Sequence, residues 1–310
     1  MLRFSVFFLT FISLSFSSEA KTFQQMFGNV RYDDGRVQSV LESLDFQQGA
    51  IALPEVSATL KTTSSFYFLN AQDMKTFYNS IGFWPDVKMD VEVGMFQSAS
   101  VPPGHPDTIY STIVYEPGYV SEAVISAIDD DESLKKMASR VSLYSASSSD
   151  STKDAQFVGW GTAPKYDAKS HSLYWSVEAK VEDQGKSRQI LFHFGSIFGR
   201  KGTLYVCLIS SKGQSSSAQR TLAKFIKQVT FSEGQSYADY VNGDSVSKNG
   251  VRGLSSKVTQ PEWSPMFSDT LTTGGYTRIG SIALIAVAST AVVLLRRQRK
   301  TSRFSDTWSS

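Results

Sequence analysis

The chain has 310 residues, of which 41% are hydrophobic, and its 31 basic and 29 acidic side chains give a formal net charge of +2. Seven basic and two acidic residues lie outside residues 21–277, which leaves 24 basic and 27 acidic residues in that central part, a net charge of about −3. This balance excludes nucleic acid as an expected partner. The single cysteine, Cys207, excludes an intramolecular disulfide and is interpreted as a small buried hydrophobic residue.

Residues 1–20 have the pattern of a cleaved signal peptide. Arg3 precedes an apolar run of thirteen residues, and the small residues Ser18 and Ala20 fit the small-x-small cleavage rule. Thirteen apolar residues are too few to cross a membrane comfortably, which argues against an uncleaved anchor. We therefore expect cleavage after Ala20 and export of the segment that follows.

Residues 21–48 are polar and mixed in composition, with a short helix expected around Val37–Leu44. From Gly49 onward the pattern changes to short extended pieces, at 50–53, 57–62 and 65–69. We therefore expect a folded domain over residues 49–241, preceded by a separate polar segment.

The next part of the chain alternates between a helix and strands. Asn70 is expected to cap a helix that ends near Gly82. Alternating apolar residues predict strands at 91–95 and 109–115. Three prolines within residues 101–106 fix the backbone and remove hydrogen-bond donors, so they predict a rigid loop between these strands.

Residues with metal-binding or catalytic chemistry are present, but their spacing is unspecific. The four acids at 129–132 precede a helical stripe and are interpreted as a helix cap, because no calcium-loop spacing follows them. His105, His171 and His193 lack the spacing of a zinc site. No nucleophile elbow and no phosphate-binding glycine loop is present, so neither a cofactor nor a metal is expected.

The clearest pattern predicts an antiparallel meander at about 155–210. Apolar and polar residues alternate strictly from His171 to Val181, and short turns connect this strand to further strands at 189–194 and 203–209. Apolar residues between Ala218 and Val229 recur at helical spacing and supply a face to cover the sheet. The fold class is therefore α+β: an antiparallel sheet covered by a few helices, with one C-terminal transmembrane helix in addition.

The C-terminal part predicts a membrane anchor. Residues 242–277 are rich in Gly, Ser, Thr and Asn and are expected to form a flexible tether. Residues 278–296 contain an uncharged apolar run of seventeen residues, which predicts a single transmembrane helix. The following tail, 297–310, is basic at its start and therefore expected in the cytoplasm, with the domain on the other side.

The expected setting is the bacterial inner membrane. An exported animal domain of this size usually contains several disulfides, and this chain has one cysteine and no Asn-x-Ser/Thr sequon. We therefore expect a single-pass protein of the inner (cytoplasmic) membrane, with its N-terminal domain extracytoplasmic, or periplasmic.

Residues 49–255 resemble an uncharacterised bacterial family of predicted membrane-anchored proteins, a domain of unknown function. Each motif is weak alone, whereas their order and spacing are fairly specific: Tyr115–Val120, Phe157–Trp160, Pro164, Tyr166, Asp167, His171, Leu173, Trp175, Phe198–Gly202, Phe231, Gly234, Tyr237–Asp239 and Asp244. The Ser-rich insert before Gln156 and the polar tail after Arg303 look less like the family. The resemblance implies a signal peptide and one C-terminal span, and it implies no reaction, ligand or catalytic residue.

Aromatic rings beside directional polar groups form the candidate binding patch. Its members are Trp160, Tyr166, Asp167, His171, Tyr174 and Arg200. Such a patch suits a glycan, a peptide or a protein partner. The alternative is ordinary packing of large rings over the meander, with Asp167 bonded within its own turn and Arg200 solvated in a hairpin.

Three classes of function remain open. A non-catalytic, membrane-anchored module that binds an envelope protein or polymer is favoured, because catalytic motifs are missing. An envelope hydrolase with an unrecognised site is the first alternative, since a catalytic triad does not depend on chain order. An assembly subunit of a membrane complex, packed through small residues of the span, is the second.

Overall fold

The computed structural model describes residues 18–81, 92–105, 107–136, 138, 155–183 and 186–256. The strands are β1 (Glu19–Lys21), β2 (Phe46–Leu53), β3 (Ala58–Thr62), β4 (Phe66–Asn70), β5 (Glu92–Ser98), β6 (Tyr110–Pro117), β7 (Ala155–Asp167), β8 (Ser172–Asp183), β9 (Lys186–Phe198), β10 (Gly202–Ser211) and β11 (Val229–Phe231). The helices are α1 (Phe23–Phe27), α2 (Gly35–Glu42), α3 (Ala71–Ser80), α4 (Glu122–Ser126) and α6 (Ser215–Gln228), and residues 130–136 are also helical.

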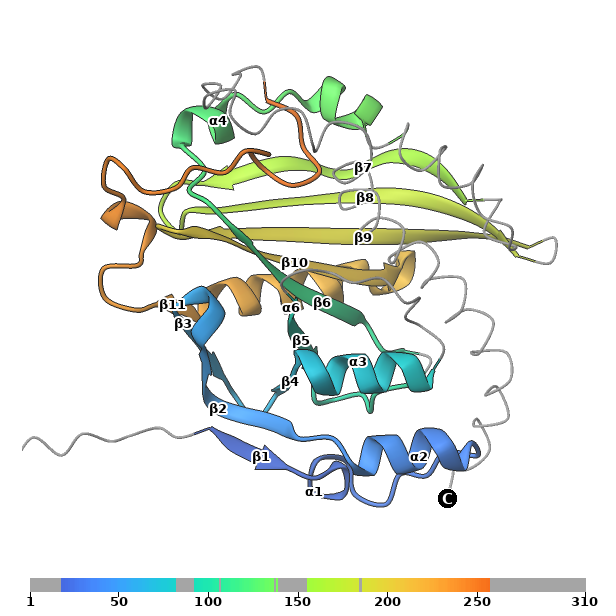
Figure 1. Cartoon of the computed structure of the whole chain (residues 1–310). Coiled ribbons are helices and arrows are strands. Elements are labelled where there is room, and N and C mark those ends of the chain that lie inside the picture. Colours follow the sequence, from blue (N-terminus) through green and yellow to red (C-terminus); the bar gives the residue numbers. More distant parts are fainter. Residues whose placement is uncertain are drawn as a thin grey trace, which may run out of the picture.

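One antiparallel sheet organises these elements (Figure 1). The strand order is β11-β3-β2-β4-β5-β6-β10-β9-β8-β7, and β1 pairs with β2 beside this path. The expected α+β class, an antiparallel sheet covered by a few helices, is confirmed. The pairing of β6 with β10 joins the N-terminal strands to the meander.

The meander expected at 155–210 is confirmed as β7, β8, β9 and β10, each paired with the next. Leu173, Trp175 and Val177 lie on one face of β8 and are at most 2% exposed. On the other face of the sheet, α6 buries Leu222 and Phe225. Burial of a Leu or Phe side chain contributes about 2 to 3 kcal/mol each, so α6 stabilises the meander substantially.

The helices lie on both faces of the sheet (Figure 1). Side chains of α1, α2, α3 and α4 belong to one core cluster, which also includes Trp175. Side chains of α6 belong to the second cluster. Asn70 caps α3 by accepting a hydrogen bond from the Asp73 amide at 2.9 Å, as expected from the sequence. In the same way Asp129 accepts from the Glu132 amide at 2.9 Å, which agrees with a helix cap at the acidic run.

The polar segment expected at 21–48 is part of the folded body. Phe23, Leu41 and Phe46 in this segment are at most 1% exposed, and α2 matches the short helix expected around Val37–Leu44. The boundary expected at residue 49 falls inside β2, which begins at Phe46. The segment contains ten apolar side chains among its 28 residues, and all ten are buried in the core or packed against it.

The expected start of the flexible tether, residue 242, is also too early in the sequence. Residues 242–256 pack on the body, and Val251 and Leu254 in this stretch are each 3% exposed. Val246 pairs with Tyr119, and Ser256 pairs with Ile128. The folded part therefore extends beyond the expected limit of 241, and the rest of the tether, 257–277, lies outside the described residues.

The two expected membrane-related segments lie largely outside the described residues. Of the signal peptide, 1–17 is not described, and β1 spans the expected cleavage position at Ala20. The transmembrane helix expected at 278–296 and the tail at 297–310 are not described either. Among the helices that are described, none combines the length and apolar character needed to cross a membrane.

Strand β7 forms one end of the sheet order and is irregular. Its register with β8 shifts three times, the last shift falling between Thr162 and Lys165. Register shifts of this kind mark bulges, which twist an edge strand and interrupt its hydrogen-bonding groups. Pro164, within the last shift, has no backbone N–H to donate.

Candidate binding surface

Tyr166 and His171, two members of the sequence-predicted patch, meet at the β7–β8 turn. The Tyr166 hydroxyl lies 3.1 Å from His171 Nδ1. The backbone of His171 has a φ of 45°, and its carbonyl accepts a hydrogen bond from the Phe198 amide at 2.9 Å. This bond ties the turn to the end of β9, so the left-handed backbone and the packing together fix the imidazole.

His171 is one step in a row of stacked rings. Its ring centroid lies 4.4 Å from that of Tyr237, which lies 4.8 Å from Tyr119, and Tyr119 lies 4.0 Å from Tyr240. The planes within each pair are inclined by 29° or less. We call Tyr166, His171, Tyr237, Tyr119 and Tyr240 the tyrosine ladder. Tyr237 is 6% exposed, whereas the other four rings are half-buried and reach the surface.

Tyr237 fixes the middle of the ladder. Its hydroxyl donates a hydrogen bond to the Val120 carbonyl at 2.9 Å, and burial raises the pKa of this phenol above its usual value. The residue lies in a short 3₁₀ turn, Tyr237–Asp239, whose start is capped reciprocally by Ser236 and Asp239. The local sequence therefore builds the turn that presents the ring.

Arg200 fastens the loop that carries Tyr240. Its Nε donates to one oxygen of Asp244 at 2.7 Å and its Nη2 donates to the other at 3.1 Å, while Nη1 donates to the Gly234 carbonyl at 3.2 Å. The hydrogen bonds from Arg200 lower the pKa of Asp244, and the Val241 amide adds to this effect. Arg200 is thus a clamp across residues 234–244 rather than a solvated hairpin cation.

Of the remaining three residues of the expected patch, Asp167 lies in the same turn but bonds only within it, whereas Trp160 and Tyr174 lie elsewhere. Asp167 accepts from the Lys169 amide at 3.0 Å and from the Ser170 hydroxyl at 2.8 Å, within its own turn. Trp160 is half-buried against the core and pairs with Val177, whereas Tyr166 pairs with Leu173. These two rings are therefore separated by four residues of β8, about 13 Å.

Tyr174 lies on the opposite face of the sheet and belongs to a buried polar chain. Its hydroxyl lies 3.2 Å from His193 Nδ1, and His193 Nε2 lies 3.1 Å from the Ser210 hydroxyl. His193 is 0% exposed and Ser210 is 4% exposed, and burial lowers the pKa of His193 to about 4. A serine beside a histidine is the geometry of an activated nucleophile. Because both side chains are buried, a substrate does not reach them. We therefore interpret the hydrogen-bonded side chains of Tyr174, His193 and Ser210 as structural.

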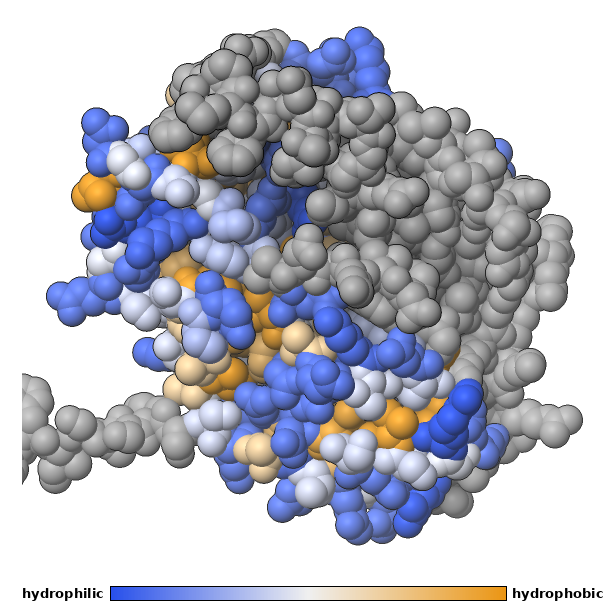
Figure 2. All heavy atoms as spheres, viewed as in Figure 1, coloured by the Kyte–Doolittle hydropathy of each residue, from blue (hydrophilic) through white to orange (hydrophobic). Residues whose placement is uncertain are grey.

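The ladder includes residues that pattern analysis did not select as a site. Tyr119 and Tyr237 entered only through the family resemblance, and Tyr240 did not enter at all. Beside them lie two of the three exposed large apolar residues among the described residues, Val241 at 50% and Val246 at 40% exposure. In Figure 2 the upper left, where the chain from 237 onward runs in Figure 1, shows small apolar areas among hydrophilic residues. The sequence feature that could have indicated this surface is the high content of Tyr and Val between residues 237 and 246, a segment without helical or strand periodicity.

Metal chemistry finds no support in the described part of the chain, which contains no group of three or more His, Cys, Asp or Glu side chains arranged to hold an ion. Burial raises the pKa of the Cys207 thiol, so this cysteine is a poor nucleophile. The fold and surface together define an α+β domain with a preformed aromatic surface.

The chain belongs to the family described as protein of unknown function (DUF2167), whose model matches residues 45–260. The family of unknown function that the sequence resembled is thereby confirmed. No curated protein matches the sequence.

Three solved structures show weak similarity to the chain. The solution structure of cyanobacterial PsbP from Synechocystis sp. PCC 6803 has 8% identity and a TM-score of 0.35, with coverage of 59% of this chain and 91% of that one. The Ran-binding protein Mog1p of Saccharomyces cerevisiae has 9% identity and a TM-score of 0.31, with 61% and 96% coverage. LpqN of Mycobacterium tuberculosis, involved in cell envelope biogenesis, has 11% identity and a TM-score of 0.29, with 60% and 90% coverage. Similarity at this level assigns no function.

Proposed function

We propose that this protein is a non-catalytic binding module, held at the bacterial inner membrane by one C-terminal span, whose ladder surface binds an envelope protein. The observation that carries the proposal is the tyrosine ladder with Val241 and Val246 beside it. Aromatic residues are enriched in the cores of protein interfaces and among the residues that contribute most to binding.

The ladder suits binding because it is ordered in advance. Stacking between neighbouring rings and the Arg200–Asp244 clamp hold the side chains in one arrangement. Binding of a partner therefore costs little side-chain conformational entropy, which improves affinity for a given contact area. Exposed Val241 and Val246 extend the apolar centre of the surface.

Site-specific crosslinking in native cells tests this role. A photo-crosslinking residue at position 241 or 246 should capture the same envelope protein, and one at position 158 should not. Val158 is a matched control because it is 54% exposed, as Val241 is 50% exposed, but it lies on β7 beside Gly159, the partner of Glu178. The captured protein, once purified, should bind the wild-type chain and the Val158→Asp variant equally. Val241→Asp should weaken this binding by about tenfold or more. No position-specific capture, or equal binding by both variants, refutes the proposal.

The membrane part of the proposal rests on the apolar run within 278–296 and on the basic residues that follow it. Truncation after residue 277 should release the protein from the membrane fraction, while the full chain should resist alkaline extraction. A tag at residue 310 should be protected from protease added to spheroplasts, and the folded domain should be accessible. Retention of the truncated chain in membranes would contradict the anchor, without affecting the test of the ladder surface.

A further inference from the structure

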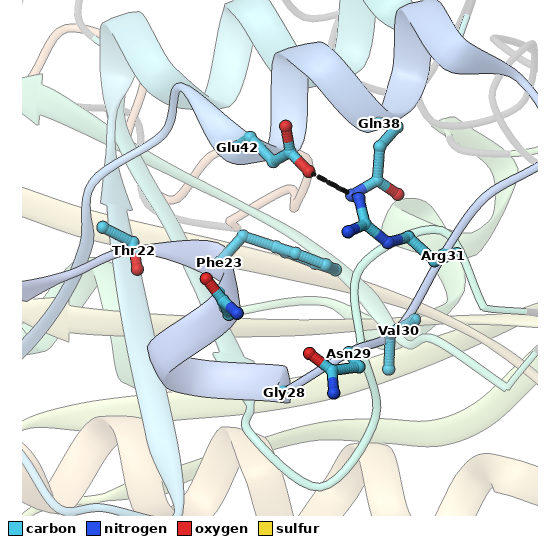
Figure 3. Close-up of a pocket in the computed structure, with 9 residues that line it drawn as sticks. Thr22, Phe23, Gly28, Asn29, Val30, Arg31, Gln38 and Glu42 are labelled. Carbon is cyan, nitrogen blue, oxygen red and sulfur yellow. Dashed lines mark hydrogen bonds and ion pairs between the residues drawn. The ribbon is translucent and has the colours of Figure 1, made fainter.

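A small hollow opens between α1, the connection that follows it and α2 (Figure 3). Its volume is about 260 Å³. This is slightly below the usual range of about 300 to 1,000 Å³ for drug-sized sites, so a smaller ligand fits. The lining residues precede the part matched by the family model. In Figure 1, α1 and α2 lie at the bottom, whereas β7 and β8 lie near the top.

One wall of the hollow is backed, beneath its surface, by the ring of Phe23. It is 1% exposed, and its centroid lies 5.2 Å from that of Phe27 and 6.0 Å from those of Tyr32 and Phe46. Because four rings pack together, this wall does not depend on a ligand for its position.

Opposite charges stand at the rim. Arg31 Nη1 lies 3.2 Å from a carboxylate oxygen of Glu42, and their side chains are 75% and 50% exposed. An exposed ion pair contributes little to stability, so a ligand separates the two charges at small cost. Figure 3 shows the Arg31 guanidinium next to the Glu42 carboxylate, each from a different element.

Glu42 is held in place by its own helix. Gln38 Nε2 donates to the same carboxylate oxygen at 2.6 Å, and Gln38 Oε1 accepts from the Tyr32 amide at 3.0 Å. Glu42 is also the last residue of α2, whose final turn has no basic residue. The Glu42 carboxylate adds its negative charge to the negative end of the helix dipole there, so this side of the hollow favours a cation.

We propose that the hollow binds a small zwitterion of the size of a free amino acid or a dipeptide. Its carboxylate pairs with the Arg31 guanidinium, its ammonium pairs with the Glu42 carboxylate, and its carbon atoms lie along Val30, which lines the hollow and is partly exposed. A simple anion meets repulsion from Glu42, and a simple cation meets repulsion from Arg31, so a ligand with both charges fits best.

The test uses the full-length protein and alanyl-alanine as the probe, with saturation-transfer difference NMR as the readout. We expect saturable binding of the free dipeptide. The N-acetylated and the C-amidated dipeptide, each lacking one charge, should each bind about tenfold more weakly.

Two variants assign the charges. Glu42→Gln should remove the preference for the free over the acetylated amine, and Arg31→Gln should remove the preference for the free over the amidated carboxylate. Arg36→Gln, which changes an exposed arginine of α2 that does not line the hollow, should leave binding unchanged. The proposal is overturned by a lack of saturable binding, by equal binding of the dipeptide with both ends blocked, or by an equal loss in Arg36→Gln. None of these results bears on the ladder surface, which the crosslinking experiment tests separately.

Discussion

Two pairs of tyrosine and histidine side chains, on opposite faces of the same meander, show how burial changes the role of one arrangement. Tyr166 and His171 lie 3.1 Å apart at the half-exposed end of the sheet. Tyr174 and His193 lie 3.2 Å apart in its interior, with Ser210 on the far side of the ring. The first pair leaves its rings partly at the surface, whereas the second satisfies polar groups inside an apolar layer. Geometry within the pair is nearly the same, so its surroundings decide its role.

Deletion of each histidine side chain should give the largest contrast. His193→Ala creates a cavity and removes the partner of Tyr174 and Ser210, so we expect it to lower the free energy of unfolding by about 3 kcal/mol. His171→Ala removes a half-exposed ring and should lower it by about 1 kcal/mol. Urea unfolding followed by tryptophan fluorescence measures both values. Equal losses would show that the two pairs do not differ as described.

Acid should destabilise the protein through His193. Its pKa in the folded state is about 4, below the ordinary value of 6.5, because burial disfavours the charged ring. The contribution of neutral His193 is complete above pH 6.5. As the pH falls from 6.5 to 4 the unfolded state takes up the proton first, and the free energy of unfolding decreases by about 3 kcal/mol in total.

Unfolding measured across this pH range tests that effect. His193→Gln should lack this part of the pH dependence, and His171→Gln, as the matched control, should retain it. An unchanged slope in His193→Gln would assign the acid sensitivity to other groups.

Removal of the tyrosine hydroxyl from each pair should give a smaller difference in the free energy of unfolding. Tyr174→Phe leaves Nδ1 of buried His193 without its partner, at a cost of about 1 to 2 kcal/mol. Tyr166→Phe leaves Nδ1 of half-exposed His171 accessible to water, at a cost of about 0.5 kcal/mol or less. Parallel thermal and urea unfolding of the two variants provides the measurement, and a larger loss in Tyr166→Phe would reverse the comparison.

The smallest effect should be local, at the clamp that supports the exposed pair. Arg200→Lys retains the positive charge but loses the two parallel hydrogen bonds to Asp244. Amide hydrogen exchange at Gln235 and Val241 should become about tenfold faster, because this loop opens more often. Exchange at His193 should stay unchanged, and general acceleration throughout β9 would instead indicate global destabilisation.

The meander and its covering helix were predictable because β8 is long and alternates strictly, and because short turns connect it to the strands that follow. Leu173, Trp175 and Val177 mark one face without ambiguity, and Leu222 and Phe225 mark the helix that covers the other. The packing of residues 21–48 was not predicted, because its apolar side chains lie in elements of at most eight residues, where no face repeats often enough to stand out. The spacing of apolar residues predicts a helix or strand only where the same face of the element repeats over several residues.

The candidate surface was predictable in part. The turn between β7 and β8 places Tyr166 and His171 close together in sequence, and both were selected. Tyr119 and Tyr240 come from two segments that are distant in the sequence. No local pattern in the sequence relates these segments to the β7–β8 turn. Tyr174 was grouped with the patch because a single strand does not reveal which distant helix covers its polar face.

The irregular edge of β7 has a consequence for self-association. A regular strand of thirteen residues at the end of a sheet invites the same strand of another molecule to continue the ladder of backbone hydrogen bonds. Here three register shifts, Pro164 and exposed Lys165 interrupt that template. Neighbouring copies of the domain are thereby hindered from joining edge to edge, and each domain keeps its own boundary.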